Sequence, residues 1–109
     1  MKLIMSIVNT DDARELVRAL LRMGHRATII STTGGFLREG NSTVLSGVED
    51  DQVTSVLEII RENCHTRIQH VNPPLSAIGP GGFHMPTPME VKEGGATVFV
   101  LDIEHFEKL

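Results

Sequence analysis

Apolar and polar positions alternate in blocks along the chain, and their spacing predicts a first strand followed by a helix. Residues 2–8 are an apolar, partly β-branched run with the length of a buried strand. Apolar side chains then recur at helical spacing, at Leu16, Val17, Leu20 and Leu21. Asp12 and Glu15 are spaced as in a capping box, and Gly24 has the position of a residue that ends a helix. The first helix is therefore expected between these two signals.

The same order of elements recurs further along the chain. Residues 25–31 and 43–48 predict two strands, and acids at 49–51 suit the start of a second helix, where the helix dipole favours negative charge. The apolar stripe of this helix consists of Val53, Val56, Leu57, Ile60 and Cys64. Further strands are expected at residues 67–71, 89–91 and 96–103, the last two around a turn at residues 94–95.

This order predicts an α+β fold of the ferredoxin-like βαββαβ type, with both helices on one face of an antiparallel sheet and an extra β-hairpin. Residues 1–109 are expected to form a single domain. Residues 72–88 contain all five prolines and predict a long flexible loop, of a kind that compact domains keep mainly for function. Strand positions 29–30 and 44–45 are apolar on both faces, so we expect a second copy of the chain to cover the face opposite the helices.

Composition narrows the class of protein. A formal charge of −4 gives no electrostatic footprint for DNA or RNA. The apolar N-terminal run is too short for membrane insertion, and a single cysteine fits a reducing compartment, so a cytoplasmic protein is expected. Cys64 lies on the apolar stripe and is predicted to be a core residue, and the histidines lack zinc-ligand spacing. No hydrolase motif appears, so an enzyme is not expected. A small enzyme that uses a cleft at the sheet edge stays open as an alternative.

Residues 31–43 are the stretch with the most evident binding chemistry. Gly34 and Gly35 permit close backbone approach, hydroxyls and an amide supply neutral hydrogen-bond partners, and Phe36 adds one flat face. The residues alone leave two interpretations open: a tight turn with an apolar anchor, or a site for a small polar ligand or nucleotide. Arg26 and Thr28 are two positions apart in the predicted strand before this stretch, so their side chains project from the same face. Arg26 is either a phosphate contact or a solvated surface arginine.

Several short blocks, spread over nearly the whole chain, carry a resemblance to a known family. They are residues 1–4 (MKLI), 26–28 (RAT), 32–37 (TTGGFL), 40–43 (GNST), 47–50 (GVED), 86–91 (PTPMEV) and 94–100 (GGATVFV). In order and spacing these blocks resemble the PII-like cyclic di-AMP receptor family. The resemblance implies a non-enzymatic signal-transduction protein without a cofactor: a ferredoxin-like homotrimer that binds cyclic di-AMP in clefts between subunits. It further implies that the loops rearrange to signal to a downstream protein that the sequence does not identify.

The resemblance also implies a set of ligand-binding residues, namely Arg26, Thr28, Gly35, Phe36, Leu37, Asn41, Gly47, Phe99 and Lys108. Arg26 and Thr28 correspond to polar contacts with phosphate or base. The stretch from Gly35 to Leu37 corresponds to an adenine cradle, and Asn41 to a base-edge partner. Gly47 allows close backbone approach, and Phe99 packs near a base from the neighbouring subunit.

Three positions depart from the family pattern. Gly24 stands where members have Asn, His25 where Phe is common, and Lys108 where Gln is found. The loss of an amide at position 24 removes about 1 kcal/mol of net hydrogen bonding, and Lys108 offers a phosphate contact instead. A second hypothesis is a PII-type protein–protein regulator that binds ATP, ADP or another adenine nucleotide, or no ligand, with the 72–88 loop docking a target.

Overall fold

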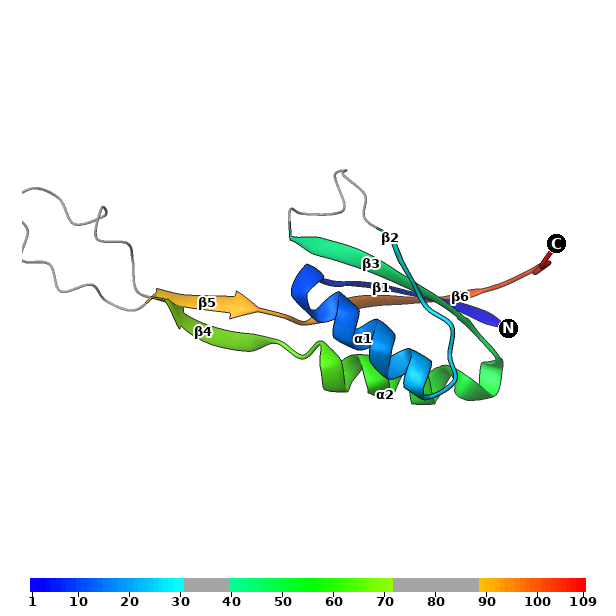
Figure 1. Ribbon diagram of the computed structural model, residues 1–109, viewed down its shortest axis with the longest axis horizontal. Helices are drawn as coiled ribbons and strands as arrows, with labels where there is room; N and C mark the ends of the chain where they lie inside the picture. Colours follow the sequence, from blue (N-terminus) through cyan, green and yellow to red (C-terminus); the bar gives the residue numbers. More distant parts are fainter. Residues whose placement is uncertain (31–39, 72–88) are drawn as a thin grey trace, which may run out of the picture.

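The computed structural model describes residues 1–30, 40–71 and 89–109. The elements follow in the order β1 (Lys2–Asn9), α1 (Thr10–Arg22), β2 (Thr28–Ile30), β3 (Asn41–Val48), η1 (Asp50–Gln52), α2 (Val53–Asn63), β4 (Arg67–Val71), β5 (Met89–Glu93) and β6 (Ala96–Asp102). A four-stranded antiparallel sheet has the strand order β2-β3-β1-β6, and β4 pairs with β5 in a separate two-stranded sheet (Figure 1). A four-stranded sheet with two helices on one face confirms the ferredoxin-like α+β prediction at this level.

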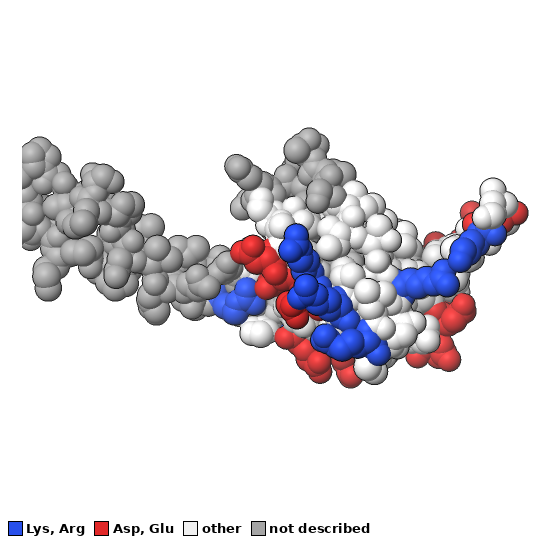
Figure 2. Space-filling model, in the orientation of Figure 1, with Lys and Arg blue, Asp and Glu red and all other residues white. Residues whose placement is uncertain are grey.

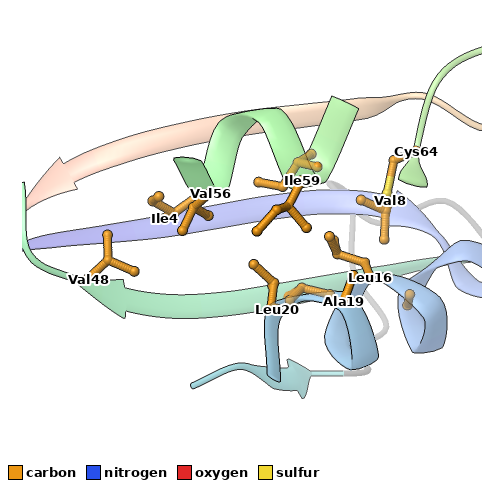
Figure 3. Packing of buried hydrophobic residues seen from close by; sticks show 12 residues of the cluster. Ile4, Val8, Leu16, Ala19, Leu20, Val48, Val56, Ile59 and Cys64 are labelled. Carbon is orange, nitrogen blue, oxygen red and sulfur yellow. The ribbon is translucent and has the colours of Figure 1, made fainter. Parts of the chain in front are cut away.

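The core lies between the helices and one face of the sheet. Along β1 burial alternates, so that Ile4, Ser6 and Val8 point to the helices and the residues between them point to the other face. Figure 3 shows this aliphatic layer, in which Leu16 and Leu20 of α1 meet side chains from α2 and the strands. The sequence contains no Trp or Tyr, and the described core is built from Val, Ile, Leu and Ala together with Cys64.

The boundaries of α1 are set by residues on either side of it. The side chain of Asn9 caps the helix by accepting a hydrogen bond from the backbone N–H of Asp11 at 2.9 Å, so the prediction of a cap at Asp12 with Glu15 was wrong. Asp12 is instead buried in the first turn, 8% exposed, where its carboxylate has another partner. At the other end Gly24 has φ of +81°, which confirms it as the residue that ends the helix.

The second helix follows its predicted pattern. A short 3₁₀ turn, η1, precedes it, with the Gln52 side chain accepting a hydrogen bond from the Glu49 N–H at 3.3 Å. The predicted apolar stripe packs into the core, with Val56, Ile60 and Cys64 fully buried. Cys64, 2% exposed, is confirmed as a core residue.

The strand predictions need correction near residues 94–95. These two glycines do not join a pair of hydrogen-bonded strands, because β5 pairs with β4 while β6 pairs with β1. The reason lies in composition: β6 (ATVFVLD) is an apolar run that complements β1, whereas β5 (MEVKE) carries three charges. Two boundaries also differ, since β2 begins at Thr28, after Arg26, and β3 begins at Asn41.

Candidate functional site

A cavity of about 540 Å³ lies at the end of the four-stranded sheet where β1 begins. Its lining residues are Met1, Arg26, Gly47, Phe106, Glu107 and Lys108. Three of them belong to the predicted ligand set, although 82 positions separate the first from the last in sequence, from Arg26 to Lys108 (108 minus 26). The fold therefore brings Arg26, Gly47 and Lys108 to one place.

Hydrogen bonds to two backbone carbonyl groups position the segments that line the cavity. The carbonyl of Arg26 accepts a hydrogen bond from the Ser46 hydroxyl at 2.7 Å, which fixes the segment before β2 against β3. On the opposite side, the Ile103 N–H donates to the Met1 carbonyl at 3.2 Å, so the C-terminal segment leaves β6 beside the first residue of the chain. Arg26 and the segment that carries Lys108 thus both line the cavity at the start of the sheet.

Gly47 forms part of the cavity, and no contact among the described residues requires a glycine there. It is not among the glycines with positive φ, so its backbone conformation is open to any residue. A Cβ built at this position meets no atom of the described residues within 4 Å. A glycine inside a strand weakens the strand and often marks a place where a ligand or another backbone comes close. Gly47 therefore leaves this side of the cavity open among the described residues.

The charges around the cavity favour an anion of low charge. Arg26 and Lys108 are both exposed and supply two cations. The N-terminal ammonium is paired with Asp50 at 2.8 Å, and its hydrogen bond, aided by its charge, lowers the pKa of that carboxyl. Glu107 adds one carboxylate, which lies 3.6 Å from Nε2 of His105. A phosphate group suits the two remaining cations, whereas Glu107 limits how much negative charge the cavity accepts.

Two more of the predicted residues lie on the sheet face that turns away from the helices. The register places Thr28, Leu45, Met5 and Phe99 in one row across β2, β3, β1 and β6. Gly47, Leu3 and Leu101 form the neighbouring row on the same face. Thr28, Phe99 and Gly47 therefore share one side of the sheet, which we call the open face. On this face Phe99 and Leu101 are both 44% exposed.

Asn41 lies at the far end of the sheet from the cavity. It pairs with Asn9 at the opposite end of β3 from Gly47, six residues along a strand, or roughly 20 Å. There it lines a second cavity of about 320 Å³ together with Thr66, Gly94 and Gly95. Within one chain, Asn41 and Arg26 therefore cannot contact the same small ligand.

The remaining predicted residues, Gly35, Phe36 and Leu37, lie outside the described residues. Sequence reasoning missed three lining residues of the cavity: Met1, Glu107 and the aromatic residue Phe106. A signal was available, because Phe106 and Lys108 are two positions apart and alternate residues of an extended segment share a side.

Two other features of the described residues do not form binding sites. The thiol of Cys64 has a pKa raised to about 11, mainly because it is buried and secondly because Asp12 is nearby, so it is not a nucleophile. Arg14, Arg18 and Arg22 give α1 a band of positive charge bordered by carboxylates (Figure 2). Arg18 is paired with Glu15 at 2.7 Å, as on a solvated helix face.

In the part of the chain that the structure describes, no helix has the length and apolar character needed to span a membrane.

Fold and cavity together define a small ferredoxin-like protein with a cavity at one end of its sheet that two cationic side chains line. The chain belongs to the cyclic-di-AMP receptor family: the model of the family described as "Cyclic-di-AMP receptor" matches residues 1–109, the whole chain. It is also similar to a solved structure, the crystal structure of a functionally unknown protein from Pediococcus pentosaceus ATCC 25745. The two share 40% sequence identity with a TM-score of 0.74, and the match covers 99% of this chain and 96% of that one.

Proposed function

We propose that this protein is a non-enzymatic signal-transduction protein that binds cyclic di-AMP in clefts between the subunits of a homotrimer. Binding rearranges loops, and the rearrangement is read by a partner protein. The observation that carries the proposal is the cavity of Arg26, Gly47 and Lys108 in a member of the cyclic-di-AMP receptor family. Two cations, an open glycine and an aromatic ring match a purine linked through phosphodiesters.

The position of Asn41 supports a site between subunits. Arg26 and Asn41 contact the same ligand if they come from different copies of the chain, because roughly 20 Å of strand separates their ends of the sheet within one copy. The open face supports assembly in the same way. Met5, Leu45, Phe99 and Leu101 make it apolar, and no described residue of the same chain covers it with a helix. An apolar surface of this kind is typical of protein–protein interfaces.

The N-terminus of α1 supports a route for the signal. The Thr10 N–H donates to the Gly40 carbonyl at 2.7 Å. The hydroxyl of Thr10 lies 3.0 Å from the hydroxyl of Ser42. Two residues further on, Asp12 holds Arg67 at the start of β4. Gly40 and the first residue of β4 are thus both bonded to the first turn of α1, so a change at Gly40 can reach the β4–β5 sheet.

Calorimetric titration tests the ligand assignment. We expect cyclic di-AMP to bind the purified protein with one ligand per chain, and ATP and ADP to compete weakly because Glu107 and the small number of cations disfavour a higher charge. Sedimentation equilibrium in the same buffer should give the mass of a trimer. Absence of heat with cyclic di-AMP contradicts the proposal, and tighter binding of ATP or ADP would support the PII-type regulator instead.

A further inference from the structure

We infer that Phe106 is a base-stacking residue of the ligand cavity, a role that rests on the proposed function but goes beyond the residues that the family resemblance supplies. Phe106 lines the 540 Å³ cavity with Arg26 and Lys108, and the residue is 62% exposed. The chain has four Phe and no Trp or Tyr, so aromatic faces are scarce. One of them is placed, largely uncovered, beside two cations.

The local geometry places the ring of Phe106 and the ammonium of Lys108 on the same side of the C-terminal segment. Residues 103–109 continue past β6 without helical structure (Figure 1), and alternate residues of an extended chain share a side. The intervening residues agree with this alternation, since His105 and Glu107 approach each other to 3.6 Å. The segment thus presents an aromatic face and a cation together to the cavity.

The chemistry of the ligand requires such a pair. A cyclic dinucleotide carries two purines and two phosphates, so its recognition needs flat surfaces close to cations. Phe106 lies beyond the end of β6 whereas Phe99 lies within it, and of these two rings it is Phe106 that lines the cavity with Arg26 and Gly47. We assign one purine to the ring of Phe106, with the adjoining phosphate on Lys108 and Arg26.

Affinity for cyclic di-AMP tests this assignment through a matched set of variants. Replacing a stacked aromatic residue with Ala typically weakens binding about 5- to 150-fold, and we expect Phe106→Ala to fall in this range. Phe106→Leu keeps an apolar side chain but removes the π face, so it should recover only part of the affinity. Leu109→Ala is the control, because Leu109 is fully exposed in the same segment and does not line the cavity.

A spectroscopic readout separates stacking from a merely structural effect. Because the protein contains no Trp, Phe106→Trp introduces a single indole fluorophore. We expect cyclic di-AMP to quench the emission of this variant with the dissociation constant found by calorimetry, whereas Leu109→Trp should respond weakly. Sedimentation and circular dichroism of each variant check assembly and folding.

The outcomes of the two proposals are distinguishable. If the unmodified protein binds no cyclic di-AMP, the proposed function fails. If it binds, but Phe106→Ala binds equally tightly and the emission of Phe106→Trp is not quenched, the stacking role is overturned while the proposed function stands. Loss of affinity in a folded, assembled Phe106→Ala variant, together with ligand-dependent quenching in Phe106→Trp, supports the role.

Discussion

The guanidinium of Arg67 holds both carboxylate oxygens of Asp12, with Nη2 at 3.0 Å from Oδ1 and 3.3 Å from Oδ2. This ion pair connects the first residue of β4 with the first turn of α1, across 55 residues of sequence. The Asp12 side chain is 11% exposed and that of Arg67 34%, so the pair is partly shielded from water. It attaches the base of the two-stranded sheet to the core.

Removing the Asp12 charge should therefore lower stability. We expect Asp12→Asn to lower the free energy of unfolding by about 1–3 kcal/mol, because a charge-assisted hydrogen bond is lost and Arg67 keeps an unpaired charge. Urea denaturation measures the change. Glu15→Gln, which breaks the exposed pair with Arg18, is the control and should change stability by about 0.5 kcal/mol or less. Equal effects of the two variants would show that the Asp12–Arg67 pair contributes no more than a surface pair.

Gly47→Ala should separate stability from binding. The strand should gain about 0.5–1 kcal/mol, since Ala replaces a flexible Gly without strain or clash in the described chain. Affinity for cyclic di-AMP should nevertheless fall, because the new methyl group occupies the cavity.

Gly95→Ala provides the contrast for this variant. Its φ of +87° and a Cβ position 2.8 Å from Oγ1 of Thr66 make the substitution strained. Thermal unfolding should show a loss of roughly 1 kcal/mol or more.

For Gly47→Ala, an unchanged affinity for cyclic di-AMP would mean that no occupant approaches Gly47.

The open face can be tested for assembly with two neighbouring residues of β6. Leu101 and Val100 are both 44% exposed, but they point to opposite faces of the sheet. We expect Leu101→Asp to dissociate the oligomer, because a charge enters an apolar interface, and Val100→Asp to leave it assembled. Sedimentation velocity reports the mass of each. Dissociation by Val100→Asp alone would place the interface elsewhere.

The Cys64 thiol should be unreactive in the folded protein. With its pKa raised from 9.0 to about 11, roughly one thiol in a thousand is ionised at about pH 8. Reaction with a thiol reagent should be slow until guanidinium chloride unfolds the chain.

The same shift has a consequence for stability at high pH. Above about pH 9 the unfolded state loses the Cys64 proton, whereas the folded state keeps it. The contribution of the protonated thiol to the free energy of unfolding is therefore fully present below about pH 9 and is lost as the pH rises towards about 11. A Cys64→Ala variant should lack this part of the pH dependence. Rapid labelling of the native thiol would contradict the buried position.

Patterns of local sequence predicted the helices well and the strand partners less well. The stripe from Val53 to Cys64 and the terminating Gly24 depend on neighbouring residues, so periodicity was sufficient to locate both helices. The pairing of β6 with β1 joins segments about 95 residues apart, as Met5 and Phe99 show, and local spacing carries no information on such a partner. The cap on α1 was misplaced for a related reason, since Asp12 is used by Arg67, 55 residues away.

The sequence predicted a set of candidate site residues but not where in the fold they lie. Arg26, Gly47 and Lys108 came from a family resemblance, and the structure brings these three together. Asn41 lies at the other end of the sheet, which no linear pattern indicates. Phe106 was missed because its importance comes from the cavity that it lines, not from a motif.

The central claim is that Arg26 of one subunit and Asn41 of the next bind the same ligand, and mixed oligomers test it most directly. Arg26→Ala and Asn41→Ala should each bind cyclic di-AMP poorly as pure proteins. When the two variants are unfolded together and reassembled, about a quarter of the sites in a random ring receive an intact Arg26 and an intact Asn41 from adjacent chains. We expect calorimetry to find this fraction of sites with the affinity of the unmodified protein. A mixture that assembles normally but recovers no such sites would contradict it.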